Sequence, residues 1–172
     1  PTLTRNTTAV IQEPKKGYHL TEDIADDAIT WLREQKAYAP EKPFLMYWAP
    51  GAGHGPHHIF KEWADKYKGQ FDDGWDALRE RTFKRQIEMG IIPPDTKLTA
   101  RDPLMASWDS IAPEQRPFQE RLMELFAGMV EHTDAEIGRM LDGMAARGLR
   151  DNTLIFYIFG DNGSSAEGQQ GS

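Results

Sequence analysis

The sequence predicts an α/β fold in which a mixed, mostly parallel sheet is flanked by helices. Two short segments, residues 43–49 and 153–159, are almost entirely apolar, as are strands that are buried on both faces. Between them, residues 114–147 carry apolar side chains at three- and four-residue spacing, which indicates a long amphipathic helix. A strand, a helix and a strand in this order form a crossover unit. We therefore expect 43–49 and 153–159 to be neighbouring or near-neighbouring strands of one sheet, with the helix packed across it.

The chain begins with a segment of little periodicity. Residues 1–17 are expected to form a surface arm or an extended edge. Thr21 is then a suitable N-cap, and the two residues after it are acidic, which favours the first turn of a helix. Apolar residues follow at helical spacing until Pro40 and Pro43, which should end this first helix.

The first predicted strand leads into a loop, residues 50–58, that is rich in glycine, proline and histidine. Residues 59–112 are the least regular part of the chain, and we expect them to be an insertion over one side of the domain. Within this insertion, short helices are expected over about 59–67 and 75–89.

Composition excludes several classes of partner and site. The 172 residues suffice for one modest domain with a core. The net charge of −7 and the lack of a basic tract argue against a nucleic-acid partner or an anionic membrane surface. The longest apolar runs are far too short to span a bilayer, so no membrane partner is expected. The chain has no cysteine, and therefore no disulfide, thiolate metal site or cysteine nucleophile.

The end of the chain carries the most informative motif, in which Gly160, Asp161, Asn162 and Gly163 follow the second predicted strand. Ligand sites in open α/β sheets lie at the carboxyl ends of strands. Asp161 and Asn162 offer adjacent oxygen ligands of the kind that Ca²⁺ or Mg²⁺ prefers. The alternative is an Asn-Gly turn that closes a β-hairpin, and spacing alone leaves both interpretations open. The chain has no initiator Met and stops shortly after this motif, so we expect a piece of a longer protein.

The other chemical feature is the loop after the first strand, which holds His54, His57 and His58. Neutral imidazoles can bind metal, and charged ones can bind anions or donate a proton to a leaving group. A zinc site is disfavoured because the chain has no cysteine and no HExxH helix. One functional histidine with two surface neighbours fits better than zinc, and a wholly structural loop is the alternative.

Four stretches, in their order and spacing, resemble the central part of a type I sulfatase of the alkaline phosphatase superfamily. They are residues 17–25, 43–58, 131–139 and 151–163. The resemblance covers nearly the whole chain, residues 1–172, as the central part of a sulfatase catalytic domain. It is greatest to the large bacterial arylsulfatases, which carry a long insertion after the histidine loop, as residues 59–112 do here.

This resemblance implies an alkaline phosphatase-like fold that is incomplete in this chain, and hydrolysis of sulfate esters. In the family, the nucleophile is a formylglycine made from a Cys/Ser-x-Pro-x-Arg motif, and a divalent cation, usually Ca²⁺ with Mg²⁺ possible, holds the sulfate. Asp161 and Asn162 match two ligands of that cation. His54 matches the histidine that contacts the ester near its leaving oxygen. The implied partners are a small-molecule sulfate ester and the remainder of the parent polypeptide.

The chain also departs from the family pattern. Gly53 replaces the usual proline before the histidine, and Gly160 replaces the usual serine before the aspartate. Neither change removes a functional side chain. The Cys/Ser-x-Pro-x-Arg motif, the paired N-terminal aspartates and the lysine beyond the Asp-Asn pair are absent. These residues alone are therefore not expected to catalyse turnover, whereas the parent protein is.

Two other functions remain as alternatives. Phosphodiesterases and phosphonate hydrolases of the same superfamily usually carry a histidine where this chain has Asn162, to suit a softer transition metal, so Asn162 favours the sulfatase. A non-catalytic binding or assembly module is the interpretation that applies if the chain is complete. The intact mass of the natural product distinguishes this module from an enzyme.

Overall fold

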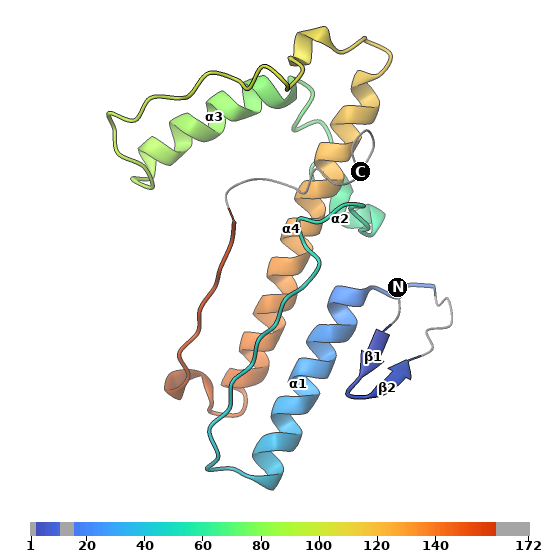
Figure 1. The fold of residues 1–172 in the computed structure, drawn as a ribbon, viewed down its shortest axis with the longest axis vertical. Helices are drawn as coiled ribbons and strands as arrows, with labels where there is room; N and C mark the ends of the chain where they lie inside the picture. Colours follow the sequence, from blue (N-terminus) through green and yellow to red (C-terminus); the bar gives the residue numbers. More distant parts are fainter. Residues whose placement is uncertain (1–2, 11–15, 161–172) are drawn as a thin grey trace. The chain divides into compact units, whose positions relative to one another are not determined.

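The structure is a computed structural model that describes residues 3–10 and 16–160. Two compact units are distinguished by their internal contacts. Within the described residues, the first unit combines the chain up to Gly51 with residues 133–160, and the second consists of residues 52–132. Helices make up most of the regular structure in both units (Figure 1).

The first unit opens with a small β-hairpin. Strand β1 (Leu3–Arg5) pairs antiparallel with β2 (Thr8–Val10) across a tight turn. Asn6 adopts a positive φ of 54° in this turn, a conformation that Asn tolerates better than most residues. The Arg5 guanidinium donates to both carboxylate oxygens of Asp27 on the following helix. The expected surface arm is therefore a hairpin anchored by an ion pair.

Helix α1 (Leu20–Tyr38) follows the course that the apolar periodicity predicts and ends before Pro40. Its N-cap differs from the expected Thr21. His19 is the cap, because its Nδ1 accepts a hydrogen bond of 3.2 Å from the backbone N–H of Thr21. A ring nitrogen thereby satisfies one of the amides that the first turn of any helix leaves unpaired.

Small side chains let α1 pack closely in the core of this unit. Ala25 and Ala28 of α1 are buried with Met140, which lies on the last part of the long helix α4 (Arg116–Ala145). Met46 and Trp48 pack against the same cluster from the segment that follows α1. Beyond α4, a single 3-10 turn, η2 (Arg150–Asn152), reverses the chain.

The two predicted strands are extended but are not paired. Segments 43–50 and 153–160 run in the same direction in Figure 1, each returning from the C-terminal end of a helix. In the described part of the chain, the sheet consists of β1 and β2 alone, so the expected mostly parallel sheet is not observed. The physical reason is that a strand needs a hydrogen-bonding neighbour on at least one edge, and neither segment meets one among the described residues.

The second unit contains the segment expected to be an irregular insertion. Two helices form there, α2 (Lys61–Asp65) and α3 (Gly74–Glu88), close to the expected positions. A 3-10 turn, η1 (Trp108–Ser110), brings the Trp108 indole onto the start of α3. Gly74 is required there, since a Cβ at this position would lie 2.1 Å from the Trp108 ring.

Close backbone contact also joins α2 to the first part of α4. A Cβ added to Gly128 would lie 2.8 Å from the backbone nitrogen of Ala64, whose side chain is completely buried. This contact fixes the helix that directly follows the histidine loop. The long helix expected over 114–147 is confirmed as α4 with slightly shorter bounds.

None of the helices in the described residues combines the length and the apolar character that crossing a membrane requires.

Candidate active site

The histidine loop turns sharply within the second unit. Gly53 has a φ of +85°, a left-handed conformation that a side chain would strain, and no atom lies within 4 Å of a Cβ placed there. The backbone N–H of His58 donates to the Pro56 carbonyl at 2.9 Å and closes the end of the loop. His54 therefore lies between a glycine with open space around it and a tight turn.

His54 is exposed, and one of its ring nitrogens has a defined role. Its Nδ1 lies 2.6 Å from the carbonyl oxygen of Gly55. A carbonyl oxygen only accepts hydrogen bonds, so Nδ1 carries a proton in this geometry. In the neutral ring the lone pair then lies on Nε2, and in the charged ring Nε2 carries the second proton.

His57 occupies a different environment from His54. Its side chain is only 9% exposed, and its ring meets the Phe126 ring edge-to-face with centroids 5.2 Å apart. Neither ring nitrogen has a hydrogen-bond partner among the described residues. Burial lowers the pKa of His57, and repulsion from His54 lowers it further. Both effects favour the neutral form of the imidazole.

The structure thus corrects one part of the expectation for this loop. Two surface neighbours were expected beside one functional histidine, but only His58 is exposed, whereas His57 is packed beneath α4. The three histidines also do not form a group with metal-binding spacing among the described residues. An open pocket of about 500 Å³ in this unit is lined by residues 69–73, Leu78 and Arg81, and none of the loop histidines is among its lining residues.

The predicted cation ligands Asp161 and Asn162 lie outside the described residues. The segment that leads to them is anchored at two points. The Thr153 hydroxyl donates to the Leu149 carbonyl at 2.7 Å, and the Tyr157 hydroxyl donates to Asp134 of α4 at 3.3 Å. Asp134 thereby links α4 to this extended segment.

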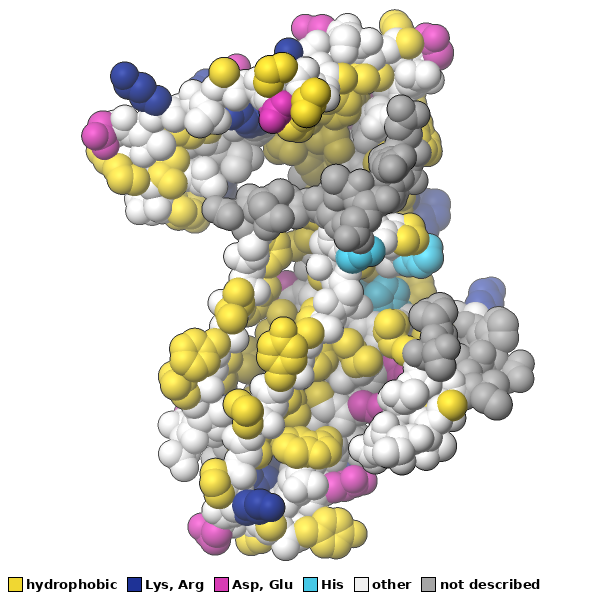
Figure 2. All heavy atoms as spheres, viewed as in Figure 1, with side chains coloured by type: hydrophobic (Ala, Val, Ile, Leu, Met, Phe, Trp, Pro, Cys, Tyr) yellow, Lys and Arg dark blue, Asp and Glu magenta, His cyan; other side chains and the backbone are white. Residues whose placement is uncertain are grey.

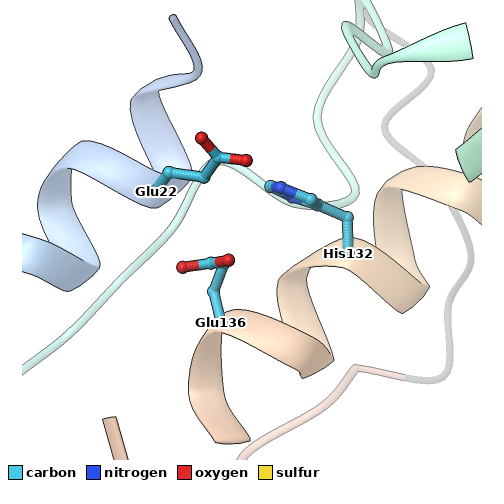
Figure 3. A group of neighbouring side chains, drawn as sticks. All are labelled: Glu22, His132 and Glu136. Carbon is cyan, nitrogen blue, oxygen red and sulfur yellow. The ribbon is translucent and has the colours of Figure 1, made fainter. Parts of the chain in front are cut away.

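A pair of acidic side chains on α1 and α4, one half-buried and one buried, was not singled out by sequence reasoning. Glu22 lies on α1 and Glu136 on α4, and their carboxylates approach within 4.8 Å of each other. Figure 3 shows both side chains together with His132, which lies one helical turn before Glu136 on α4. The only signal in the sequence is this four-residue spacing, which places both side chains on one face of a helix.

The charge of Glu136 is already balanced within the first unit. Its carboxylate accepts from Arg139, which also pairs with Asp26 of α1. The hydrogen bond to Asp26, together with the charges of both carboxylates, raises the pKa of Arg139. His132 is 1% exposed and meets the rings of Phe60 and Trp63 edge-on. Within the first unit, the ion pairs of Arg139 thus link α1 to α4.

Comparison with known proteins gives one consistent result. A family model described as sulfatase matches residues 2–172. An uncharacterised sulfatase of Schizosaccharomyces pombe is 32% identical over 165 residues, which cover 95% of this chain and 29% of that protein. An arylsulfatase of Klebsiella aerogenes is 28% identical over 151 residues, which cover 88% of this chain and 32% of that protein. The chain thus spans about a third of the length of these curated relatives.

The match to the family model runs over nearly every residue, including the histidine loop and the Asp-Asn motif. Membership of this family implies an α/β fold, the class that the two apolar segments predicted. The described residues contain only part of such a fold. This chain belongs to the sulfatase family.

Proposed function

We propose that the protein to which this chain contributes hydrolyses sulfate esters. The observation that carries the proposal is the sulfatase match over residues 2–172, which includes an exposed histidine on a tightly turned loop. The similarity to the Klebsiella aerogenes arylsulfatase supports the same reaction. A small-molecule sulfate ester is the proposed substrate, and the remainder of the polypeptide is the proposed partner of this part of the enzyme.

His54 is the residue of this chain that we assign to catalysis. Its Nδ1 proton is held by the Gly55 carbonyl, which directs contact with the ester to Nε2. A charged ring can hold a sulfate oxygen through Nε2 and then give that proton to the departing alkoxide or phenoxide. The positive charge also lies where negative charge develops on the leaving oxygen, which lowers the barrier further.

Asp161 and Asn162 are proposed as ligands of a Ca²⁺ ion, with Mg²⁺ as the second choice. The donor set fits, because a carboxylate and an amide oxygen are ligands that both cations accept. The family resemblance supports the same two residues. When bound, the cation would supply positive charge that neutralises the sulfate. The proposed formylglycine nucleophile lies outside this chain, in which no cysteine occurs.

A mostly parallel sheet is the architecture that we propose for the longer protein. Segments 43–49 and 153–159 would be neighbouring or near-neighbouring strands of that sheet. Both run in the same direction, which is the arrangement a parallel sheet requires (Figure 1). The carboxyl ends of such strands meet at one edge, so His54 and Asp161 would follow strands that end together.

Mutant kinetics on two kinds of substrate test the assignment of His54. In the full-length enzyme, His54→Ala should lower turnover of alkyl sulfates by about 10²–10⁴-fold, the usual contribution of a general acid. Nitrophenyl sulfate should suffer less, because a good phenoxide leaves without a proton. His58→Ala is the matched control, since His58 is an exposed histidine of the same loop, and His57→Ala should also be milder than His54→Ala.

Two outcomes would contradict the proposal. Equal losses at His54, His57 and His58, or a larger loss at His57 or His58, would move the role away from His54. A preference of the wild-type enzyme for phosphate diesters over sulfate esters would favour the related phosphodiesterases instead.

A further inference from the structure

Segment 154–160, which leads to the proposed cation ligands, carries a single polar side-chain group. Its residues are apolar apart from the hydroxyl of Tyr157, and it ends in a glycine. Figure 2 shows hydrophobic side chains along the course that this segment takes in Figure 1. Its backbone forms no hydrogen bond with a described residue. Within the described chain, the Tyr157 hydroxyl is therefore the group that holds this segment by a polar contact.

The partner of that hydroxyl lies on α4. Tyr157 donates to a carboxylate oxygen of Asp134 at 3.3 Å, and both residues belong to the first unit. Exposure along the segment agrees with this direction. Residues 155, 157 and 159 are 43–62% exposed, whereas residues 154, 156 and 158 are 77–89% exposed. Successive side chains of an extended chain point to opposite sides, so Tyr157 lies on the less exposed side of the segment.

The hydrogen bond contributes more to position than to stability. Partial burial, and after it the charge of Asp134 and the hydrogen bond itself, raise the pKa of Tyr157. The hydroxyl therefore keeps the proton that it donates. A single hydrogen bond between groups that water still reaches adds little to the free energy of unfolding. It does fix where an otherwise apolar segment lies along α4, because apolar contacts alone are not directional.

Chain geometry converts this fixed point into a limit on the proposed ligands. Asp161 follows Tyr157 by four residues, and an extended chain spans at most about 3.6 Å per residue, so the two Cα atoms lie within about 14 Å of each other. Without the contact, the last polar anchor is Thr153, which is eight residues before Asp161. The permitted radius then doubles to about 29 Å, and the permitted volume increases about eightfold.

We propose that Asp134 and Tyr157 are positioning residues for the cation site. Their hydrogen bond sets where the segment lies along α4, and thereby where Asp161 and Asn162 present their oxygens. The proposal rests on the proposed function, which assigns those two oxygens to the cation. Asp134 and Tyr157 themselves act only through the segment, and they contact neither the cation nor the ester.

Direct cation binding to the metal-free full-length protein tests the proposal. Tyr157→Phe removes only the hydroxyl, and Asp134→Leu removes the acceptor. Each should raise the Kd for Ca²⁺, measured by equilibrium dialysis, by about two- to eightfold, the upper figure being the increase in permitted volume. Asp134→Asn keeps an acceptor oxygen and should retain most of the affinity. Tyr47→Phe is the matched control, since Tyr47 lies on the other extended segment and is 89% exposed.

A double-mutant cycle shows whether the two residues act as a pair. If they do, the variant that combines Tyr157→Phe with Asp134→Leu should bind Ca²⁺ about as well as either single variant. Losses that multiply in the double variant would overturn the proposal, as would an unchanged Kd in both single variants. A wild-type protein that binds neither Ca²⁺ nor Mg²⁺ would overturn it as well.

Kinetics separate positioning from a general loss of structure. In Tyr157→Phe, half-saturation by Ca²⁺ should shift with the Kd, while kcat and the KM for the ester should return to wild-type values once Ca²⁺ is saturating. A kcat that stays low at saturating Ca²⁺, together with a lower urea midpoint, would assign a merely structural role. Cation binding is measured without an ester, so the proposed reaction and this proposal fail separately. Wild-type turnover of sulfate esters with no shift in Kd contradicts only the proposal, and coupled shifts without sulfatase activity contradict only the reaction.

Discussion

Replacing Gly128 by alanine should destabilise the protein, although alanine is the better helix former. In an exposed helix interior, glycine costs about 0.8–1.0 kcal/mol relative to alanine. At Gly128, however, the new methyl group would lie 2.8 Å from the backbone nitrogen of Ala64 and 2.9 Å from the carbonyl carbon of Trp63. Backbone atoms cannot move aside as a side chain can, and overpacking of this kind costs about 1–3 kcal/mol. The free energy of unfolding should therefore fall by between about zero and 2 kcal/mol.

Gly138 provides the control, because it lies on the same helix and no atom is within 4 Å of a Cβ placed there. Gly138→Ala should stabilise the protein by up to about 1 kcal/mol through helix propensity alone. Urea titration of both variants, with unchanged m-values, measures the difference directly. Because of the contact between α2 and α4, the free energy of unfolding of Gly138→Ala should exceed that of Gly128→Ala by about 1–3 kcal/mol. Equal shifts in the same direction would refute the reasoning.

Two further outcomes are expected. Because the pKa of His57 is lowered in the folded protein, the His57 imidazole of the unfolded chain becomes protonated first as the pH falls below about 6.5. This difference does not affect the free energy of unfolding well above that pH, and it lowers the free energy of unfolding as the solution is acidified. His57→Leu should remove this part of the decline in urea midpoints, and His58→Leu should retain it. In the full-length protein, Asp161→Ala should remove both the bound cation and the activity; normal metal content with normal turnover would rule out the proposed ligand role.

The helices could be predicted because their signal is local. Apolar residues at three- and four-residue spacing fix α4 and α1 regardless of what surrounds them. The hairpin β1–β2 was missed because three-residue strands are too short to show a period. The cap of α1 was assigned to Thr21 because threonine is a common cap, whereas the ring of His19 reaches the same amide.

The candidate site could be predicted only in part from the sequence. The sequence placed His54 in a glycine-rich loop as the candidate catalytic residue, and the structure shows that its side chain is exposed. The burial of His57 depends on Phe126, which is distant in sequence, so no local pattern could reveal it. The position of Glu136 beside Glu22 could not be predicted for the same reason, because Glu22 lies on another helix. The ion pair of Glu136 with Arg139, by contrast, joins residues that are close in sequence.

The helices and the extended segments of this chain are held in place to different degrees. The helices bury small, closely packed contacts of their own, such as Ala25 against Met140 and Gly128 against Ala64. The extended segments that lead to the histidine loop and to the Asp-Asn motif have no backbone partners among the described residues. A strand held only on one face can shift along its own axis, and catalytic groups tolerate little displacement. Within the described residues, close helix packing therefore holds the helices, whereas no backbone hydrogen bond holds the two extended segments.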